Sequence, residues 1–400
     1  MPQDSPVAGS MRGSAGEVFW TFLRLGLTAF GGPVAHLGYF REEFVARRRW
    51  MDERTYADLV ALCQLLPGPA SSQAGIAIGL SRAGLPGGVA AWAGFTLPSA
   101  IALTVFALLL RGLGVSRDAG WLHGLKIVAV AVVAQAVWSM GRNLCPDAPR
   151  ASLAVLAAVA VLLFPGAGVQ LAVIAAGAVA GAFWLRLPAS IPESPLAGGV
   201  SRRTAIGAWL LFFLLLGGLP ILARATGSNS LAVFDAFYRA GALVFGGGHV
   251  VLPLLQAEVV SPGWIGNSEF LAGYGAAQAV PGPLFTFAAY LGAVLGGVGG
   301  AAWCTVAIFL PAFLLVLGAL PFWEGLRGHP HARSALAGVN AAVVGVLLAA
   351  LYHPVFTSAV RAPSDLALAL AAFASLVFWK VSPLPVVVAG AIGGAMLAWF

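Results

Sequence analysis

The chain has 400 residues, of which 60% are hydrophobic and only 9% are charged. Soluble domains carry roughly 25% charged residues, so this chain could not cover a water-facing surface, and the lipid bilayer must solvate most of it. The formal net charge of +7 indicates basic loops that face the cytoplasm and lipid headgroups. It does not indicate nucleic-acid binding, because no aromatic–basic patch accompanies it.

Three cysteines, Cys63, Cys145 and Cys304, lie far apart in the sequence and form no CxxC pair. This spacing argues against a disulfide framework and against a zinc site. Residues 1–16 are small and polar, and they lack the charged start and short apolar core of a signal peptide. We therefore expect a polar N-terminal tail and a mature membrane protein in contact with lipid, with no metal and no cofactor.

Apolar stretches long enough to span a membrane recur along the chain. In the first half they cover residues of about 17–40, 55–80, 87–110, 121–140, 152–164 and 168–185. A hydrophilic, proline-containing connector at 186–203 marks the clearest boundary, and a plain span at about 204–222 follows it. Many stretches contain glycine or proline, which are frequent in membrane helices because small residues let helices approach closely.

The second half of the chain repeats the pattern of the first. At an offset of 215 residues the matched pairs are Phe22/Phe237, Arg24/Arg239, Gly26/Gly241, Phe30/Phe245, Gly31/Gly246, Gly32/Gly247 and Glu43/Glu258. At an offset of 214 they are Trp50/Trp264, Gln64/Gln278, Pro67/Pro281, Gly68/Gly282 and Pro69/Pro283. Such constant spacing indicates a tandem duplication of a unit with about six apolar segments.

We expect an all-α integral membrane protein built from two inverted-topology repeats with broken helices. Six segments and one linker helix place the second repeat upside down relative to the first, as in many secondary transporters. The predicted divisions are a tail at 1–16, a first repeat at 17–190, a connector with the linker helix at 191–230 and a second repeat at 231–400. Full crossing by every broken segment would give about 13 crossings.

The loop at about 41–54 carries five arginines, whereas its counterpart at about 256–269 has no lysine or arginine. The basic copy is expected on the cytoplasmic side. If the first segment crosses fully, the N-terminus lies outside. If Gly31, Gly32 and Pro33 turn the segment back as a re-entrant hairpin, the N-terminus lies inside and the number of crossings falls.

Arg24 and Arg239 stand at matched positions inside apolar segments. An arginine there costs at least about 2.5–3.5 kcal/mol unless it pairs, snorkels or lines a wet cavity. One interpretation is a snorkelling or structurally paired arginine. The other is a fixed positive charge for an anion, which the duplication favours because arginine binds tetrahedral oxyanions through two hydrogen bonds and keeps its charge.

Each Pro-Gly-Pro predicts a helix that ends before the first proline and a new helix that begins at the second. The new helix presents unpaired N–H groups and a positive dipole end, which together form an anion cradle. Nearby polar side chains extend this cradle: Gln64, Ser71 and Ser72 in the first repeat, and Gln278 and Thr286 in the second. A bare proline kink is the alternative. Irregular backbone is tolerated at membrane depth where it is buried in protein or lines a cavity.

Several other polar residues accompany these breaks. Lys126 lies within its segment and either binds the anion or snorkels to the interface. Glu43 and Glu258 are candidate proton carriers, with salt bridging in loops as the alternative. His36 and His249 lie near the glycine breaks and suit structural hydrogen bonds. No nucleophile–base pair or metal-ligand cluster is apparent, so we expect no catalytic residue and no enzyme.

These motifs together resemble the chromate ion transporter family in its long, two-domain form. The residues that carry the resemblance are Phe30–His36, Arg47–Trp50, Gln64–Gln73, Phe245–His249, Pro253, Glu258 and Gln278–Pro283. The resemblance covers nearly the whole chain. It implies a bacterial inner-membrane protein that expels chromate and confers chromate resistance. It also implies that sulfate, a similar tetrahedral dianion, competes with chromate or replaces it as the substrate.

The duplicated breaks predict an anion transporter with alternating access of the two repeats, and the resemblance implies that it carries out chromate efflux, which we expect to be proton-coupled. Predicted substrate-binding residues are Arg24, Arg239, Gln64, Gln278, Ser71, Ser72, Thr286 and Lys126. Predicted helix breaks are Gly31, Gly32, Pro33, Pro67, Gly68, Pro69, Gly246, Gly247, Gly248, Pro281, Gly282 and Pro283. The alternatives are a sulfate or other oxyanion transporter and a non-transporting membrane scaffold. An oligomer is compatible with the sequence.

Overall fold

The computed structural model describes residues 13–30, 32–112, 119–164, 167–185, 200–245, 248–323 and 330–397, and every regular element in these ranges is helical. The polar tail up to residue 12 and the break residues Gly31, Gly246 and Gly247 lie outside them. In the first repeat the helices are α1 (Ala15–Thr28), α2 (Gly32–Arg41), η1 (Glu42–Arg47), α3 (Glu53–Leu65), α4 (Ala70–Gly112), α5 (Gly120–Leu144), α6 (Ala148–Leu163) and α7 (Ala167–Trp184).

The linker helix and the second repeat follow in the same pattern. They are α8 (Arg202–Thr226), α9 (Asn229–Ala242), η2 (Gly248–Val250), α10 (Val251–Val259), α11 (Asn267–Ala277), η3 (Leu284–Thr286), α12 (Phe287–Ala319), η4 (Leu320–Phe322), α14 (Pro330–Ala350), η5 (Leu351–Phe356), α15 (Thr357–Ala359), α16 (Pro363–Val377) and α17 (Pro383–Leu397). Five helical stretches of the described chain are long and apolar enough to cross a membrane: 70–112, 120–144, 202–226, 284–322 and 331–359. The predicted all-α membrane class is confirmed.

The first apolar segment turns back instead of crossing. Glu17, near the start of α1, contacts Arg48 beyond η1 at 3.8 Å and Arg82 at 3.2 Å. The Arg82 guanidinium in turn lies 5.0 Å from the centre of the Trp50 ring. The start of α1 and the arginine-rich loop therefore lie at the same end of the molecule, with the break before Gly32 as the turning point. This re-entrant path rules out about 13 full crossings.

The long elements α4 and α12 are each a helical hairpin. Ala83 and Gly84 have non-helical φ and ψ angles and form a turn within α4. Gly79 and Gly87 pack directly against each other on the two sides of this turn. The matched turn in α12 lies at Gly296 and Gly297. The short first arm of each hairpin starts at a Pro-Gly-Pro, and the longer second arm is a membrane-spanning helix. The turn lies between the two predicted segments: 55–80 corresponds to α3 and the first arm of α4, and 87–110 corresponds to its second arm.

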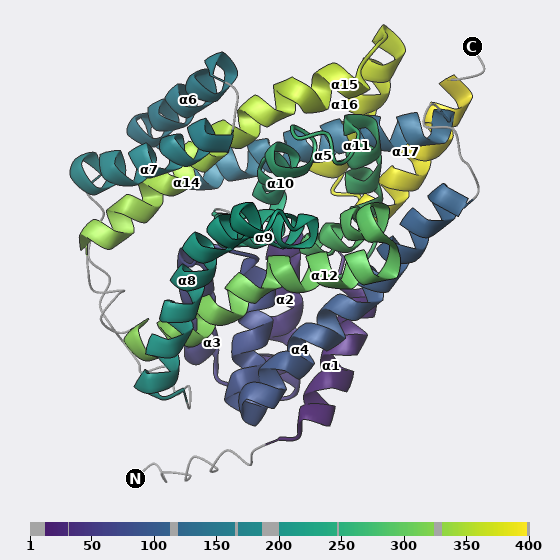
Figure 1. The fold of residues 1–400 in the computed structure, drawn as a ribbon. Helices are drawn as coiled ribbons and strands as arrows, with labels where there is room; N and C mark the ends of the chain where they lie inside the picture. Colours follow the sequence, from purple (N-terminus) through teal and green to yellow (C-terminus); the bar gives the residue numbers. More distant parts are fainter. Residues whose placement is uncertain are drawn as a thin grey trace, which may run out of the picture.

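Contacts between α4 and α12 show that the two repeats are inverted. Trp92, eight residues beyond the α4 turn, packs against Phe309 and Phe313 in the distal part of α12. Phe106, far along α4, instead lies 6.0 Å from Tyr290, which precedes the α12 turn. The second arms therefore run antiparallel, and the two hairpin turns point to opposite ends of the molecule. Figure 1 shows α4 and α12 crossing the centre.

The peripheral helices are exchanged between the repeats. In Figure 1, α14 of the second repeat lies beside α6 and α7 of the first, and α17 lies beside α5. The backbones touch where glycines face each other: Gly124 of α5 meets Gly390 of α17, and Gly338 of α14 meets Gly177 of α7. Small residues allow this close approach of membrane helices. Neither repeat can form its packed structure without the other.

This topology predicts which surface sites share a side of the membrane. In a variant without native cysteines, Gly16→Cys at the start of α1 and Ala46→Cys in η1 should react with a membrane-impermeant maleimide from the same side. Val298→Cys, 66% exposed beside the α12 turn, should react from the opposite side. Opposite labelling of Gly16→Cys and Ala46→Cys would show that the first segment crosses fully.

Candidate functional site: the meeting point of the broken helices

The breaks of the two repeats meet through two matched backbone hydrogen bonds. The Gly68 N–H donates to the Val244 carbonyl at 2.6 Å, and the Gly282 N–H donates to the Ala29 carbonyl at 2.9 Å. Each bond joins the Pro-Gly-Pro of one repeat to the chain just after the first half-helix of the other. All four broken segments therefore converge at one point, where the two repeats are related by an approximate two-fold axis.

The Pro-Gly-Pro motifs form helix starts, as the sequence predicts. Helix α3 ends at Leu65 and α4 begins at Ala70, directly after Pro69. In the second repeat the 3-10 turn η3 starts directly after Pro283 and leads into α12. The central glycines have φ angles of +118° at Gly68 and +94° at Gly282, a region that side-chain-bearing residues rarely adopt. Two helix N-termini with positive dipole ends thus lie at the centre.

Polar side chains surround these helix starts, and three of them have buried atoms with no hydrogen-bond partner among the described residues. These atoms are two donors, the Ser72 hydroxyl and the Gln278 amide nitrogen, and one acceptor, the side-chain oxygen of Gln73, whose amide nitrogen donates to the Pro67 carbonyl. The other predicted hydroxyls are engaged, since Ser71 lies 3.4 Å from His36 Nδ1 and Thr286 donates to the Pro283 carbonyl at 2.7 Å. Ser72 and Gln278 therefore offer donors to a ligand.

The two matched arginines have different surroundings. The Arg24 side chain lies on the exposed face of α1, alongside the exposed Trp20 and Leu27. Arg239 is held by two carboxylates, Asp235 at 3.0 Å and Glu258 at 2.8 Å. In this conformation the pair does not form one shared cationic site.

Two further predicted residues lie away from the chain breaks or face outward. Lys126 is 1% exposed, and its amine donates to Ser268 near the start of α11 at 2.7 Å. This contact directs the side chain along α11 toward its N-terminal end, whereas Gln278 lies at the other end of that helix. Gln64 is exposed on α3.

The two glutamates also differ. Glu43 accepts hydrogen bonds from Arg48 at 2.6 Å and from Arg47 at 3.0 Å, at the end of the molecule that carries the basic loop. Burial raises the pKa of Glu43, but the hydrogen bond from Arg48 and the charges of both arginines outweigh this effect, so its pKa lies below the usual range. Glu43 stays ionised at neutral pH, which favours the salt-bridging interpretation. Glu258 instead faces Arg239.

The structure adds residues that the sequence interpretation missed. Asp235 belongs to the Arg239 cluster, and its position four residues before the arginine is a detectable helical ion-pair signal. Thr96 is 1% exposed, and its hydroxyl has no hydrogen-bond partner in the part of the chain that the structure describes. The structural hydrogen bond predicted for His36 is confirmed, since this side chain bridges Ser71 and the Ala29 carbonyl. No sequence spacing indicates Thr96, and none identifies Ser71 as the partner of His36. Both features depend on tertiary contacts between segments that are distant in the sequence.

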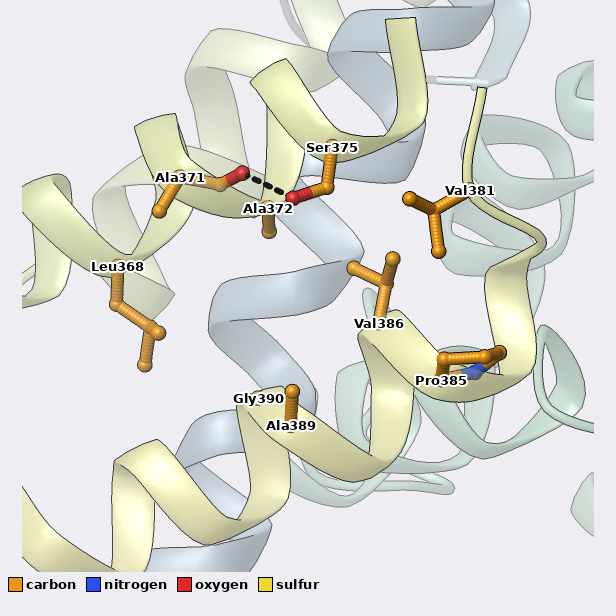
Figure 2. Close-up of a pocket in the computed structure, with 9 residues that line it drawn as sticks. All are labelled: Leu368, Ala371, Ala372, Ser375, Val381, Pro385, Val386, Ala389 and Gly390. Atoms are coloured by element: carbon orange, nitrogen blue, oxygen red, sulfur yellow. Dashed lines mark hydrogen bonds between the residues drawn. The ribbon is translucent and has the colours of Figure 1, made fainter. Parts of the chain in front are cut away.

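Two of the cavities at the periphery of the described chain differ in lining: one of about 410 Å³ beside α5 includes Arg142 and Trp138, and the other is apolar. Figure 2 shows the apolar one, of about 240 Å³, between α16 and α17, where the hydroxyl of Ser375 is turned to the Ala371 carbonyl. Its lining consists of Leu368, Ala371, Ala372, Ser375, Val381, Pro385, Val386, Ala389 and Gly390. A lining of this kind offers an anion no charge and no free donor. We place the candidate site at the central breaks, because the free donors of Ser72 and Gln278 lie there beside two helix starts.

Inverted repeats, paired broken helices and a central pair of helix N-termini define a multi-pass membrane protein of the secondary-transporter type. The sequence profile of the family described as "Chromate transporter" matches residues 16–182 and again residues 231–395. The chain belongs to the chromate transporter family.

Individual relatives agree with this assignment. A chromate transport protein of Pseudomonas aeruginosa is 30% identical over 380 residues, which cover 91% of this chain and 87% of the relative. A chromate transport protein of Cupriavidus metallidurans is 28% identical over 98% of this chain and 96% of its own length. An uncharacterised transporter of Methanocaldococcus jannaschii is 27% identical over 84% of this chain and 83% of its own length. No solved structure matches the chain.

Proposed function

We propose that this protein exports chromate across the bacterial inner membrane by proton-coupled secondary transport and thereby confers chromate resistance. The observation that carries the proposal is the reciprocal contact of the two Pro-Gly-Pro helix starts at the centre of inverted repeats. Two helix N-termini there favour an anion. Membership of the family and the names of the Pseudomonas and Cupriavidus relatives support chromate as that anion.

In this proposal the anion binds where α4 and α12 begin. The unpaired N–H groups of both helix starts, the Ser72 hydroxyl and the Gln278 amide supply the donors. Arg24 is exposed on α1, away from the central site. Its positive charge would attract the dianion to the protein before the anion reaches that site. Alternating access would require one repeat to move against the other, which breaks the hydrogen bonds at Gly68 and Gly282 on each cycle.

The charge distribution also supports an orientation. The arginine-rich loop and the start of α1 lie at the same end of the molecule. The positive-inside rule places this end in the cytoplasm. The N-terminus is then cytoplasmic, which is the re-entrant alternative that the sequence leaves open. Efflux would begin with chromate binding from this side.

The experiment is chromate uptake into liposomes that contain the purified protein, with an imposed pH gradient. Wild-type protein should accumulate chromate. Ser72→Ala and Gln278→Ala should each raise the chromate concentration for half-maximal uptake at least about tenfold, because one hydrogen bond to a charged ligand contributes a net free energy of roughly 1.5–3 kcal/mol. Ser375→Ala, in the apolar cavity of Figure 2, is the matched hydroxyl control and should not change uptake.

The same assay separates the alternatives. Stronger uptake of sulfate than of chromate, or complete inhibition of chromate uptake by equimolar sulfate, would identify sulfate as the main substrate. Absence of flux with every tetrahedral oxyanion would support a non-transporting scaffold and contradict the proposal.

A further inference from the structure

Arg239 joins two carboxylates in the interior of the second repeat. Its guanidinium contacts Asp235 at 3.0 Å, one turn earlier on α9, and Glu258 at 2.8 Å, near the end of α10. The carboxylate side chains are only 6% and 17% exposed, respectively. With both acids ionised, one positive charge faces two negative charges, so the cluster carries one excess negative charge.

One oxygen of this cluster has no partner. Asp235 Oδ1 is buried and makes no hydrogen bond among the described residues, while Oδ2 accepts from Arg239. Burying an ionised carboxylate without full hydrogen bonding is costly, and a carboxyl group next to a second one tends to hold a proton. Among the described residues, the charged groups that act on the two acids are Arg239, Arg224 near the end of α8, and the acids themselves. The cluster can therefore take up one proton and become neutral.

The matched position in the first repeat lacks this arrangement. Trp20 replaces Asp235 at the offset of 215, and the Arg24 side chain is exposed. Glu43, which matches Glu258, is bound to Arg47 and Arg48 instead. The three-residue cluster is therefore specific to the second repeat.

The cluster lies next to the central contact. The Leu243 N–H donates to the Arg239 carbonyl at 3.1 Å and closes the last turn of α9. The carbonyl of the following residue, Val244, accepts from the Gly68 N–H, two residues before the start of α4. A change of charge around Arg239 therefore acts on the end of α9, which touches the Pro-Gly-Pro that presents the α4 helix start.

We infer that Asp235, Arg239 and Glu258 form the proton-binding site that couples proton movement to transport of the anion. This inference rests on the proposed function and assigns its coupling step to one repeat. A proton enters from one side of the membrane and binds to the carboxylate pair, whose net charge with Arg239 changes from −1 to zero. After the repeats change their relative position, the same proton leaves to the other side.

The test uses the full-length protein in liposomes with a trapped pH-sensitive dye. Two activities are measured: chromate accumulation driven by a pH gradient, and chromate–chromate exchange at equal pH. Asp235→Asn and Glu258→Gln should each lower accumulation and chromate-dependent proton movement at least about tenfold, a loss of about 1.4 kcal/mol of coupling. Exchange should stay within about twofold of wild type, because it needs no net proton movement.

Two further variants make the result specific. Asp235→Glu retains a titratable group and should keep proton-driven accumulation. Glu42→Gln removes an exposed carboxylate from η1 and should change neither activity. Elution of each variant as a single monodisperse species in detergent shows that it is folded.

The outcomes separate this inference from the proposed function. Absence of all chromate movement by the wild-type protein overturns both. Normal accumulation by wild type, Asp235→Asn and Glu258→Gln alike overturns only the proton site. Equal loss of accumulation and exchange in folded variants also overturns it, since the cluster would then be part of the anion path or of the scaffold.

Discussion

Gly68→Ala and Gly282→Ala are each expected to lower chromate transport at least about tenfold, which corresponds to about 1.4 kcal/mol. Both glycines have positive φ angles, +118° and +94°, where a side chain adds strain of order 1–3 kcal/mol. A Cβ atom at Gly68 would lie 2.8 Å from Gln73 Nε2. At Gly282 it would lie 3.0 Å from the Phe95 carbonyl. Either change displaces a Pro-Gly-Pro from the opposite repeat.

Gly38→Ala is the matched control for these two variants. Gly38 lies on α2, where an added methyl group would have nothing within 4 Å, and its φ angle is ordinary. Alanine should support the helix there and leave transport unchanged. Chromate uptake and the apparent melting temperature in detergent are measured together. Gly68→Ala or Gly282→Ala with wild-type uptake would show that the reciprocal hydrogen bonds are not needed for function.

The duplication and its breaks could be predicted from sequence because they are local. A Pro-Gly-Pro at 67–69 and 281–283 dictates a helix end and a helix start wherever the chain lies. The repeat offsets likewise need no tertiary information. The path of the first segment could not be predicted in this way, because Gly32 and Pro33 permit either a bend or a full turn. Contacts of Glu17 with Arg48 and Arg82 decide between them.

Two other features could not be predicted because they depend on contacts between distant parts of the chain. These are the exchange of peripheral helices between the repeats and the surroundings of the two arginines. Gly124 and Gly390 are distant in the chain, and no periodicity indicates that they touch. Arg24 and Arg239 occupy matched positions, so the sequence indicates equal roles. Their partners differ, because Trp20 stands where Asp235 stands in the other repeat. A single substitution at a neighbouring position thus separates the chemistry of two otherwise equivalent residues.

The carboxylate pair beside Arg239, which Arg24 lacks, would affect the relative energies of the two end states of the proposed transport cycle. An inverted repeat gives the two end states similar energies, since each state exchanges the environments of the two halves. A proton site in one repeat removes that equivalence. Protonation of the Arg239 cluster would then favour one end state, because it changes the charge beside the end of α9. The first repeat contributes the start of α4 to the same contact, without an equivalent carboxylate pair.

Arg239→Ala should have the second large effect, a loss of stability on the order of 3 kcal/mol, because removal of one partner of a buried pair leaves uncompensated charge. Two carboxylates would remain, 6% and 17% exposed. Arg24→Ala is the matched variant, since no ion pair to Arg24 occurs among the described residues and its side chain is exposed. Its stability should fall by no more than about 0.5 kcal/mol. Apparent melting temperatures in detergent provide the comparison.

A triple variant identifies the cause of the Arg239→Ala effect. Combination of Arg239→Ala with Asp235→Asn and Glu258→Gln removes all three charges, so most of the lost stability should return. Proton-driven chromate accumulation should remain absent, because no titratable group is left in the cluster. Equal destabilisation of the single and triple variants would instead indicate that the packing of the Arg239 side chain, and not its charge, supports the second repeat.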